Sequence, residues 1–326
     1  MRFALTDEQR GFGDSLGDLL RASDVVAVAR SWAKDDTAPG LALWRRLADQ
    51  GLCALVVPEA SGGLGGHPVD LAVVFEQLGR HAVPGPWVES AAYLPALLGD
   101  ASPDVVASLA EGAVGSVRVA RHGVHALDAD VATHLFLADD EVRPAAVGPR
   151  AHSLDPARRL FEVSPAGDQL QVGDEAHEHA FDLAVLACSA QLQGLGEHLL
   201  EVTVDYVKQR TQFGRPIGSY QALKHQLADT RIALDFARPL VHGAAVELDG
   251  PTRSRGVSAA KVGAGQAAYS AARTALQLHG AVGYTEEHDL SLWLLKVRAL
   301  LGAWGTASFH RGRVLAAITG PGALRA

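Results

Sequence analysis

The sequence of 326 residues predicts a mainly α-helical protein with a small β-domain in its middle. Apolar residues recur at steps of three and four in the first 111 residues and again from residue 176 onward, which is the period of amphipathic helices. Between these parts, short β-rich segments alternate with glycine, proline and aspartate turns. We therefore expect an N-terminal helical domain over residues 1–111, a middle β-domain over residues 112–175, and a C-terminal four-helix bundle over residues 176–326.

The composition excludes several classes of protein. The net charge is −8 and the pI is about 5.9, so nucleic acid is not an expected partner. No stretch reaches the roughly 18 consecutive apolar residues of a membrane span, and the first residues contain no signal-peptide core. We expect a cytoplasmic protein without a membrane partner.

Cysteine and histidine spacing predicts neither a disulfide framework nor a metal site. Cys53 and Cys188 are two cysteines in a long chain, which fits a reducing compartment. His177 and His179 stand two residues apart in a polar segment. Two ligands at that spacing make a poor site, so we interpret them as solvated loop histidines.

The first domain is predicted to consist of successive helices. Thr6, with Gln9 three residues later, forms the capping-box pattern that starts the first one. A second helix is expected around Trp44, Leu47 and Leu52, and another from residue 69 to residue 79. The apolar run between them ends in a glycine-rich loop at residues 54–66, which lacks the Gly-Lys-Ser/Thr ending of a phosphate-binding P-loop.

The middle domain is predicted from four short segments rich in β-formers, bounded by turn residues. They are residues 114–120, 133–138, 159–163 and 169–172.

The central feature of the C-terminal part is a hinge between two long helices. Leu192, Leu195, Leu199, Val202 and Tyr206 lie on one face of the first helix. We expect that helix to stop at residues 213–214, because glycine tolerates the positive φ of a C′ position. A turn at Pro216 and Gly218 follows.

The second helix of the hinge carries its apolar residues in register at Leu223, Leu227, Leu234, Val241 and Leu248. The hinge then presents four side chains together: Arg210, Gln212, Phe213 and Gln221. Arg210 offers a planar charged fork suited to phosphate oxygens. The alternative is that Arg210 is a basic residue in the last turn of a helix, favoured there by the helix dipole.

An alanine-rich helix is expected over residues 258–279, where small side chains permit the close helix packing of a four-helix bundle. It ends in residues 277–285, Gln-Leu-His-Gly-Ala-Val-Gly-Tyr-Thr. The alternative for this segment is a helix that simply ends in glycine and turns.

Three stretches resemble the acyl-CoA dehydrogenase flavoprotein family. They are the Arg-x-x-Phe-Gly hinge at residues 210–214, the segment at residues 277–284, and the order of N-terminal motifs that ends in Phe-Glu-Gln-Leu-Gly-Arg at residues 75–80. The resemblance covers nearly the whole chain and is strongest from residue 190 to residue 306. It implies the fold of that family, FAD as cofactor and an acyl-CoA thioester as substrate.

The resemblance also implies cofactor-binding residues. In the family, the hinge reaches across a subunit interface to the FAD pyrophosphate, and the later glycines approach the adenine half. The implied positions here are Arg210, Gln212, Phe213, Gln221, Gln277, Gly280 and Thr306. Ala281 stands where the family usually has a second glycine, and the family's flavin-shielding loop and strand have no counterpart in residues 112–173.

The proton acceptor that the resemblance implies is missing. Most members carry a glutamate just before Gly-Thr, but here Trp304 precedes Gly305 and Thr306, and an indole N–H is a donor only. Other members carry the glutamate earlier, at the position of Ala184, followed by a substrate-binding arginine where this chain has Val185. No catalytic residue is therefore assigned.

Other carboxylates could replace the missing base. Asp182 is two residues from Ala184, a step that turns a helical side chain by about 200° and points it away. Glu197 lies on the helix that leads to Arg210, and the remaining candidates follow the glycine turn: Glu286, Glu287 and Asp289.

This combination resembles the short subunit of heteromeric (α2β2) acyl-CoA dehydrogenases of actinobacterial steroid degradation. It implies that an unlike partner chain supplies the flavin-ring pocket and the glutamate. Two alternatives stay open. One is a self-sufficient acyl-CoA dehydrogenase that uses a non-standard carboxylate, and the other is a non-catalytic scaffold or CoA-ester binding protein of the same fold.

Overall fold

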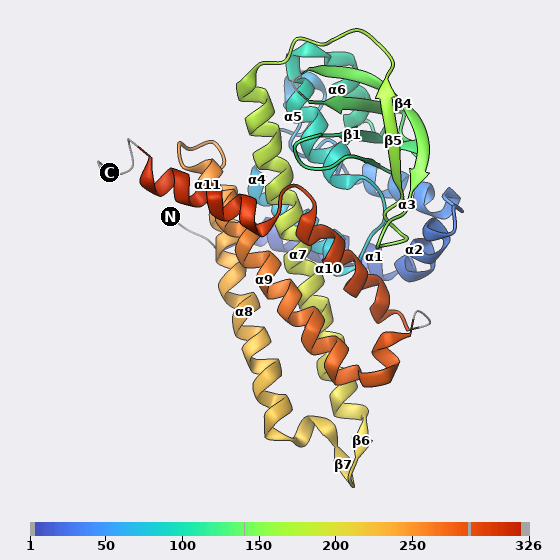
Figure 1. The fold of residues 1–326 in the computed structure, drawn as a ribbon, viewed down its shortest axis with the longest axis vertical. Coiled ribbons are helices and arrows are strands. Elements are labelled where there is room, and N and C mark those ends of the chain that lie inside the picture. The colour runs from blue at the N-terminus through green and yellow to red at the C-terminus, as the bar shows by residue number, and fades with distance from the viewer. Residues whose placement is uncertain (1–3, 140, 286–287, 321–326) are drawn as a thin grey trace.

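A computed structural model describes residues 4–139, 141–285 and 288–320. The N-terminal helices and the β-strands lie at one end of an elongated molecule, and a helical bundle extends from them to a hairpin at the other end (Figure 1). The helices of the N-terminal part are α1 (Asp7–Arg21), α2 (Val25–Ala33), α3 (Ala38–Ala48), α4 (Pro68–Arg80), α5 (Leu94–Leu98) and α6 (Pro103–Ala110). One turn of π-helix, η2 (Glu89–Tyr93), leads directly into α5.

Helix α1 begins as the sequence predicts. The Thr6 hydroxyl accepts a hydrogen bond from the Gln9 backbone N–H at 3.2 Å, and the Gln9 side-chain oxygen accepts one from the Thr6 N–H at 3.0 Å. The capping box is therefore confirmed. Leu52 lies beyond the end of α3, in the turns that follow, where it is nonetheless buried.

The glycine-rich stretch after α3 closes on itself. The Leu64 N–H donates to the Ala54 carbonyl at 2.9 Å, and the Gly66 N–H donates to the Leu55 carbonyl at 2.7 Å. A Cβ atom at Gly63 would lie 2.0 Å from the Val57 carbonyl oxygen. Glycine is needed here for close backbone packing within the loop.

The β-domain is one sheet with strand order β1-β3-β4-β5-β2. Its strands are β1 (Gly115–Arg118), β2 (Ala126–Leu127), β3 (His134–Ala138), β4 (Val142–Ala151) and β5 (Leu160–Pro165). The β1–β3 pair is parallel and the other pairs are antiparallel.

One expectation for this sheet is wrong, and one strand was not predicted. Residues 169–172 do not form a strand; the Leu170 N–H donates to the Val142 carbonyl in a single bridge. The longest strand, β4, was not expected, because Pro144, Gly148 and Pro149 oppose strand formation in a sequence pattern. A register shift between Val147 and Arg150 accommodates Gly148 and Pro149 within the ladder of β4 and β5.

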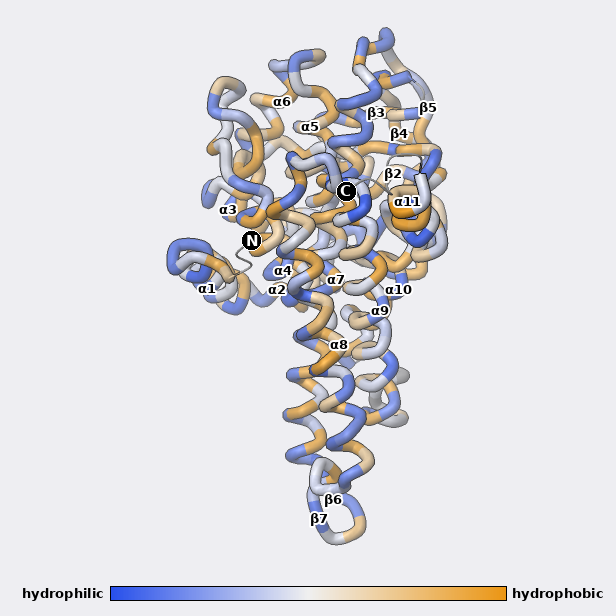
Figure 2. Tube along the Cα trace, turned by 90° about the vertical axis from the view of Figure 1, so that its left-hand side faces the viewer, coloured by the Kyte–Doolittle hydropathy of each residue, from blue (hydrophilic) through white to orange (hydrophobic). Residues whose placement is uncertain are grey.

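The bundle consists of α7 (Asp174–Gln209), α8 (Gln221–Val246), α9 (Arg253–His279) and α10 (Leu290–Gly302), with α11 (Ala307–Thr319) crossing its upper end. Strands β6 (Thr211–Gln212) and β7 (Arg215–Pro216) form the hairpin between α7 and α8. Polar and apolar residues alternate along α8 down to this hairpin (Figure 2). None of the helices described is long and apolar enough to cross a membrane.

Helices α4 and α7 cross with their backbones in direct contact. A Cβ atom at Gly79 of α4 would lie 2.1 Å from the Gln191 carbonyl oxygen, and one at Gly194 of α7 would lie 1.9 Å from the Glu76 carbonyl oxygen. Real Cβ contacts are essentially never this short. The crossing therefore requires glycine on both helices, and it joins the N-terminal domain to the bundle.

The crossing predicts the effect of adding one methyl group. Gly194→Ala should lower the free energy of unfolding by about 2–3 kcal/mol, since α4 and α7 must separate to accept it. Gly256→Ala is the matched control, because its Cβ would make ordinary contacts with Ala244, at 3.6 Å from Cα and 3.8 Å from Cβ, and alanine favours a helix by up to about 1 kcal/mol. Urea unfolding of both variants checks this. Equal stability of the two would contradict a backbone contact at the crossing.

Candidate functional site

The hairpin after α7 is a two-residue turn. Gln212 pairs with Arg215, and the residues between them, Phe213 and Gly214, have φ values of 52° and 81°. Positive φ at both central positions is the requirement of a type I′ turn, which matches the twist of the flanking strands. The expectation that α7 runs to residues 213–214 and ends on a C′ glycine is therefore wrong; the helix ends at Gln209.

Short backbone hydrogen bonds hold Arg210 at the base of this hairpin. Its N–H donates to the Tyr206 carbonyl at 2.8 Å, and its own carbonyl accepts from the Ile217 N–H at 2.8 Å. The Arg210 side chain is exposed and has no ion pair among the residues that the structure describes. Gln212 beside it is also exposed. An unpaired guanidinium on a rigid base is free to bind an anion.

The tip of the hairpin exposes a large aromatic ring. Phe213 is 91% exposed, although phenylalanine is usually buried. Gln221, the first residue of α8, is exposed on the same segment. The Arg215 guanidinium lies 4.1 Å from the centre of the Tyr220 ring. The hairpin thus presents positive charge, amide groups and an aromatic face to its surroundings.

The C-terminal end of α9 meets the last turn of α7, just before the hairpin, through a stacked pair of rings. The rings of Tyr206 and His279 stack at 4.2 Å, and the Tyr206 hydroxyl lies 3.5 Å from the His279 carbonyl oxygen. Gln277 is exposed nearby on α9, and Gly280 ends the helix with a φ of 62°. The structure therefore brings the hinge residues and the Gln277–Gly280 segment to the same end of the bundle.

Thr306 is remote from that end within one chain. Lys261 Nζ lies 3.5 Å from the carbonyl oxygen of Gly305, the residue before it. Lys261 precedes His279 by 18 residues on α9, a helical rise of roughly 27 Å. The Thr306 hydroxyl instead caps α11 by accepting from the Phe309 N–H at 3.3 Å.

Trp304 occupies a strained and well-held position. Its φ is 55°, a region that costs a non-glycine residue energy. Its carbonyl oxygen lies 2.9 Å from His310 Nε2, and its ring centre lies 4.9 Å from that of Tyr93. Ala184 and Val185 are fully buried in α7. Neither position at which a proton acceptor was expected carries a group that can accept a proton.

The other carboxylates weighed from the sequence are held in ion pairs. Asp182 is fully buried and accepts from Arg313 at 2.7 Å and from Arg253 at 3.3 Å. Glu197, also buried, binds Arg231 and Arg238. These contacts join helices of the bundle and give both carboxylates a structural role.

Among the candidates after the glycine turn, the structure describes only Asp289. Asp289 pairs with Arg30 near the surface at 2.7 Å. Glu286 and Glu287 lie outside the described residues. No group of three or more potential metal ligands occurs within the described ranges.

Sequence reasoning missed one carboxylate, Glu89. It is only 5% exposed and belongs to the π-helical turn η2, a distortion that is frequent at functional sites. The Ser90 hydroxyl holds this turn against β1, donating to the Gly115 carbonyl at 2.7 Å and accepting from its N–H at 2.8 Å. The available signal was a single glutamate inside the apolar run from residue 86 to residue 98.

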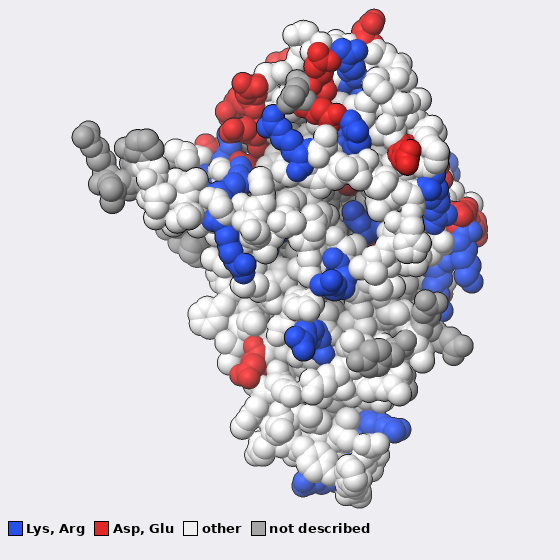
Figure 3. All heavy atoms as spheres, viewed as in Figure 1, with Lys and Arg blue, Asp and Glu red and all other residues white. Residues whose placement is uncertain are grey.

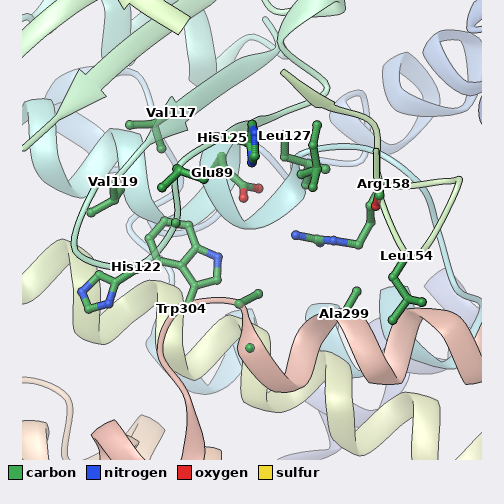
Figure 4. Close-up of a pocket in the computed structure, with 16 residues that line it drawn as sticks. Glu89, Val117, Val119, His122, His125, Leu127, Leu154, Arg158, Ala299 and Trp304 are labelled. Atoms are coloured by element: carbon green, nitrogen blue, oxygen red, sulfur yellow. The ribbon is translucent and has the colours of Figure 1, made fainter. Parts of the chain in front are cut away.

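Glu89 points into a cavity of about 290 Å³, the inner cavity, which lies between η2, the β-domain and the end of α10 (Figure 4). The Arg158 guanidinium enters from the opposite side, and Trp304 forms part of the floor. Burial raises the pKa of Glu89 to about 7, with Arg158 opposing the shift. In the space-filling view, a hollow opens on this face between the β-strands and α10 (Figure 3).

A second, larger cavity of about 610 Å³, the outer cavity, adjoins the first. The two share Val119 and His122. The His122 ring stacks on Phe181 at 4.0 Å, and burial lowers its pKa to about 4, so it is neutral at physiological pH. The outer cavity is more polar and includes Arg121, Arg313 and other charged side chains.

Comparison with known proteins gives consistent matches to one group. Residues 6–107 match the acyl-CoA dehydrogenase N-terminal domain and residues 173–319 match the acyl-CoA dehydrogenase C-terminal domain. The chain is 34% identical over 298 residues to the acyl-CoA dehydrogenase IpdE2 of Mycobacterium tuberculosis, covering 88% of this chain and 90% of the relative.

Two solved structures have the same fold at low sequence identity. The Tcur3481-Tcur3483 steroid ACAD G363A variant aligns with a TM-score of 0.82 and 22% identity, over 96% of this chain and 98% of that one. The ChsE4-ChsE5 complex from Mycobacterium tuberculosis aligns with a TM-score of 0.81 and 21% identity, over 98% and 99% of the two chains.

The hairpin geometry predicts that Phe213 contributes nothing to the stability of the chain itself. Phe213→Ala should change the free energy of unfolding by less than about 0.5 kcal/mol, because the ring is exposed. Gly214→Val should cost about 1–2 kcal/mol, since a β-branched residue is strained at positive φ. Thermal unfolding of the two variants tests the contrast. A large loss of stability in Phe213→Ala would show that its ring packs within the chain.

Proposed function

The chain belongs to the acyl-CoA dehydrogenase family, and we propose that it is the base-lacking subunit of a two-chain enzyme that desaturates an acyl-CoA thioester at its α and β carbons. Two features support the proposal. Trp304 stands just before Gly305 and Thr306, where the resemblance places the family's proton acceptor, and the hairpin at the other end of the bundle keeps Arg210 and Phe213 exposed.

The hairpin end of the bundle fits the tail of FAD. Arg210 is unpaired among the described residues and suits a pyrophosphate, and Phe213 offers an uncovered aromatic face. The exposed amides of Gln212, Gln221 and Gln277 can donate to ribose or phosphate oxygens. Gly280, which adopts a positive φ, has no side chain and leaves room for an approaching ligand.

In this proposal FAD, when bound, supplies the acceptor for the hydride that leaves the β-carbon. Residues of this chain hold its pyrophosphate and adenosine part: Arg210, Gln212, Phe213, Gln221, Gln277 and Gly280. Thr306 was expected to join them. Thr306 lies beside Lys261 of α9, roughly 27 Å along that helix from the hairpin end of the bundle. In this chain it therefore caps α11 and does not contact the FAD that the hairpin binds.

The partner chain supplies the proton acceptor. Removal of the α-proton needs a carboxylate or similar base within hydrogen-bond reach of that carbon. An indole at residue 304 excludes water there and accepts no proton. Ala184 and Val185 leave the other position apolar. The two-chain ChsE4-ChsE5 neighbour supports an unlike partner, and the steroid ACAD neighbour supports a steroid-derived acyl group as one substrate class.

The partner requirement predicts inactivity of the chain alone. Expressed by itself, it should not oxidise acyl-CoA esters with an artificial electron acceptor. Co-expression with an unlike acyl-CoA dehydrogenase chain should give an active complex with one flavin per two chains. Turnover by the isolated chain would reject the proposal in favour of a self-sufficient enzyme with a non-standard carboxylate.

The hairpin assignment predicts a specific loss of cofactor. Arg210→Ala should lower the flavin content of the purified complex at least about tenfold, because a charge-assisted hydrogen bond to phosphate is lost. Its thermal stability without flavin should not change. The matched control is Arg255→Ala, an exposed arginine near the start of α9. Full flavin content in Arg210→Ala would show that Arg210 does not hold FAD. A complex that purifies without flavin even with Arg210 in place would favour a scaffold or CoA-ester binding protein that does not use FAD.

A further inference from the structure

The walls of the inner cavity are apolar on most sides. Val117 and Leu127 line it from the first two strands, Leu160 from β5, Ala299 from α10 and Trp304 from the loop after α10. Its volume of about 290 Å³ matches a small organic group and is at the lower end for ligand pockets. A ligand of this cavity therefore has an apolar body of limited size.

Two polar side chains of opposite charge face each other across this cavity. Figure 4 shows the Glu89 carboxyl group and the Arg158 guanidinium directed toward its centre from opposite sides. Glu89 is 5% exposed and Arg158 is half-buried. Neither forms an ion pair with a residue in the described part of the chain. Both are therefore available to a ligand between them.

The surroundings of Arg158 explain why it is left unpaired. The next residue, Arg159, forms ion pairs with the nearby carboxylates, with Asp128 at 3.1 Å and Asp130 at 2.6 Å. The Trp32 indole N–H also donates to Asp128 at 2.9 Å. The Arg158 backbone N–H is bonded to the Asp155 carbonyl at 2.9 Å. The backbone is thus fixed while the guanidinium extends alone into the cavity.

Several titratable groups surround Glu89. Desolvation is the largest effect on its pKa, which is about 7; Arg158 lowers it and Asp128 raises it. The other groups nearby are His122 and His125 in the cavity wall, Tyr93 on the same helical turn, and Cys188 on α7, whose thiol feels the charge of Glu89. Near neutral pH, Glu89 is therefore present in both the protonated and the ionised form.

We propose that the inner cavity binds the carboxylate end of a small apolar ligand, with Arg158 pairing to that carboxylate and protonated Glu89 donating a hydrogen bond to it. An arginine fork matches a carboxylate in two parallel hydrogen bonds. A phosphate dianion would bring two charges to the buried Glu89 and is disfavoured. A neutral alcohol would leave the Arg158 charge without a partner inside an apolar cavity.

The carboxylate can come from two sources. It can be a free medium-chain acid, or the far end of an acyl group whose thioester and CoA lie outside. The outer cavity adjoins the inner one at Val119 and His122 and is lined by Arg121 and Arg313, so a polar remainder of a longer ligand has a place. The inference concerns the cavity of this chain and stands whether or not a partner supplies a proton acceptor.

The affinity for the ligand should fall as the pH rises, because the carboxyl groups of Glu89 and of the ligand face each other. Ionised Glu89 would repel the ligand carboxylate, and protonated Glu89 attracts it. Binding therefore takes up a proton, and affinity should fall about tenfold for each pH unit above the pKa of Glu89, near 7. Below that pKa, affinity should level off until the ligand itself becomes protonated.

The experiment is titration calorimetry of octanoate into the full-length chain from pH 6 to pH 8.5, with octanamide as the neutral counterpart. We expect octanoate to bind more tightly at pH 6 than at pH 8.5 and octanamide to bind weakly at both. Arg158→Gln should weaken octanoate about tenfold or more. Arg150→Gln is the matched control, because that arginine pairs with Asp35 outside the cavity and should leave the affinity unchanged.

A second variant separates binding from folding. Glu89→Gln keeps a neutral donor, so it should retain octanoate binding at pH 6 and lose the decrease above pH 7. No binding of octanoate, equal binding of octanamide, or unchanged affinity in a folded Arg158→Gln chain would each overturn the proposal. Its folding is checked by circular dichroism.

Competition identifies the source of the carboxylate. Suberoyl-CoA carries a free carboxylate at the far end of its acyl chain, and octanoyl-CoA does not. Displacement of octanoate by suberoyl-CoA alone supports an acyl thioester that ends in a carboxylate. Displacement by neither supports a free acid. Equal displacement by both would show that the cavity does not recognise the carboxylate and would overturn the site.

Discussion

The rest of the structure depends on the backbone contact between α4 and α7. Gly79 and Gly194 let the two helices touch at distances that no side chain permits. Helix α7 is then buried on all sides from Ala180 to Glu197, and the chain that leaves α4 reaches η2 through residues 81–88. The contact thereby sets Glu89 and the inner cavity against the upper part of the bundle, while the lower half of α7 extends to the hairpin.

The molecule therefore has two candidate sites of different kinds, far apart. The hairpin end is convex and exposed, and its side chains can contact a second molecule. The inner cavity is concave and enclosed by several elements: η2, the β-domain, α10 and the loop that follows it. Ion pairs of Asp182 and Glu197 tie the helices between them. These buried ion pairs hold the helices of the bundle together.

The sequence predicted those features that depend on local chemistry. The capping box of Thr6 and Gln9, the long helices α7 and α8, the family resemblance and the Trp304 substitution were all readable from residue order. The end of α7 was misplaced, because Phe213 also adopts positive φ and makes a hairpin where glycine alone suggested a helix end. Strand β4 was missed, since Gly148 and Pro149 are accommodated by a register shift in the ladder that only the tertiary structure provides.

Glu89 was missed for a different reason. A single glutamate in an apolar helix gives no spacing pattern, and its importance comes from Arg158, which lies 69 residues later in the sequence. Only folding brings the two to opposite sides of one cavity. Features that arise from such pairs of distant residues lie beyond periodicity and motif reasoning.

The backbone around Trp304 has a consequence of its own. Its carbonyl is held by His310, and the preceding helix end is held by the Lys261 ammonium on the Leu300 carbonyl at 2.8 Å. None of these bonds involves the indole. Hydrogen bonds to main-chain carbonyl groups thus set the direction in which the side chain of residue 304 projects. A glutamate at this position would point the same way. The backbone of this loop therefore orients the side chain at residue 304 whichever amino acid stands there.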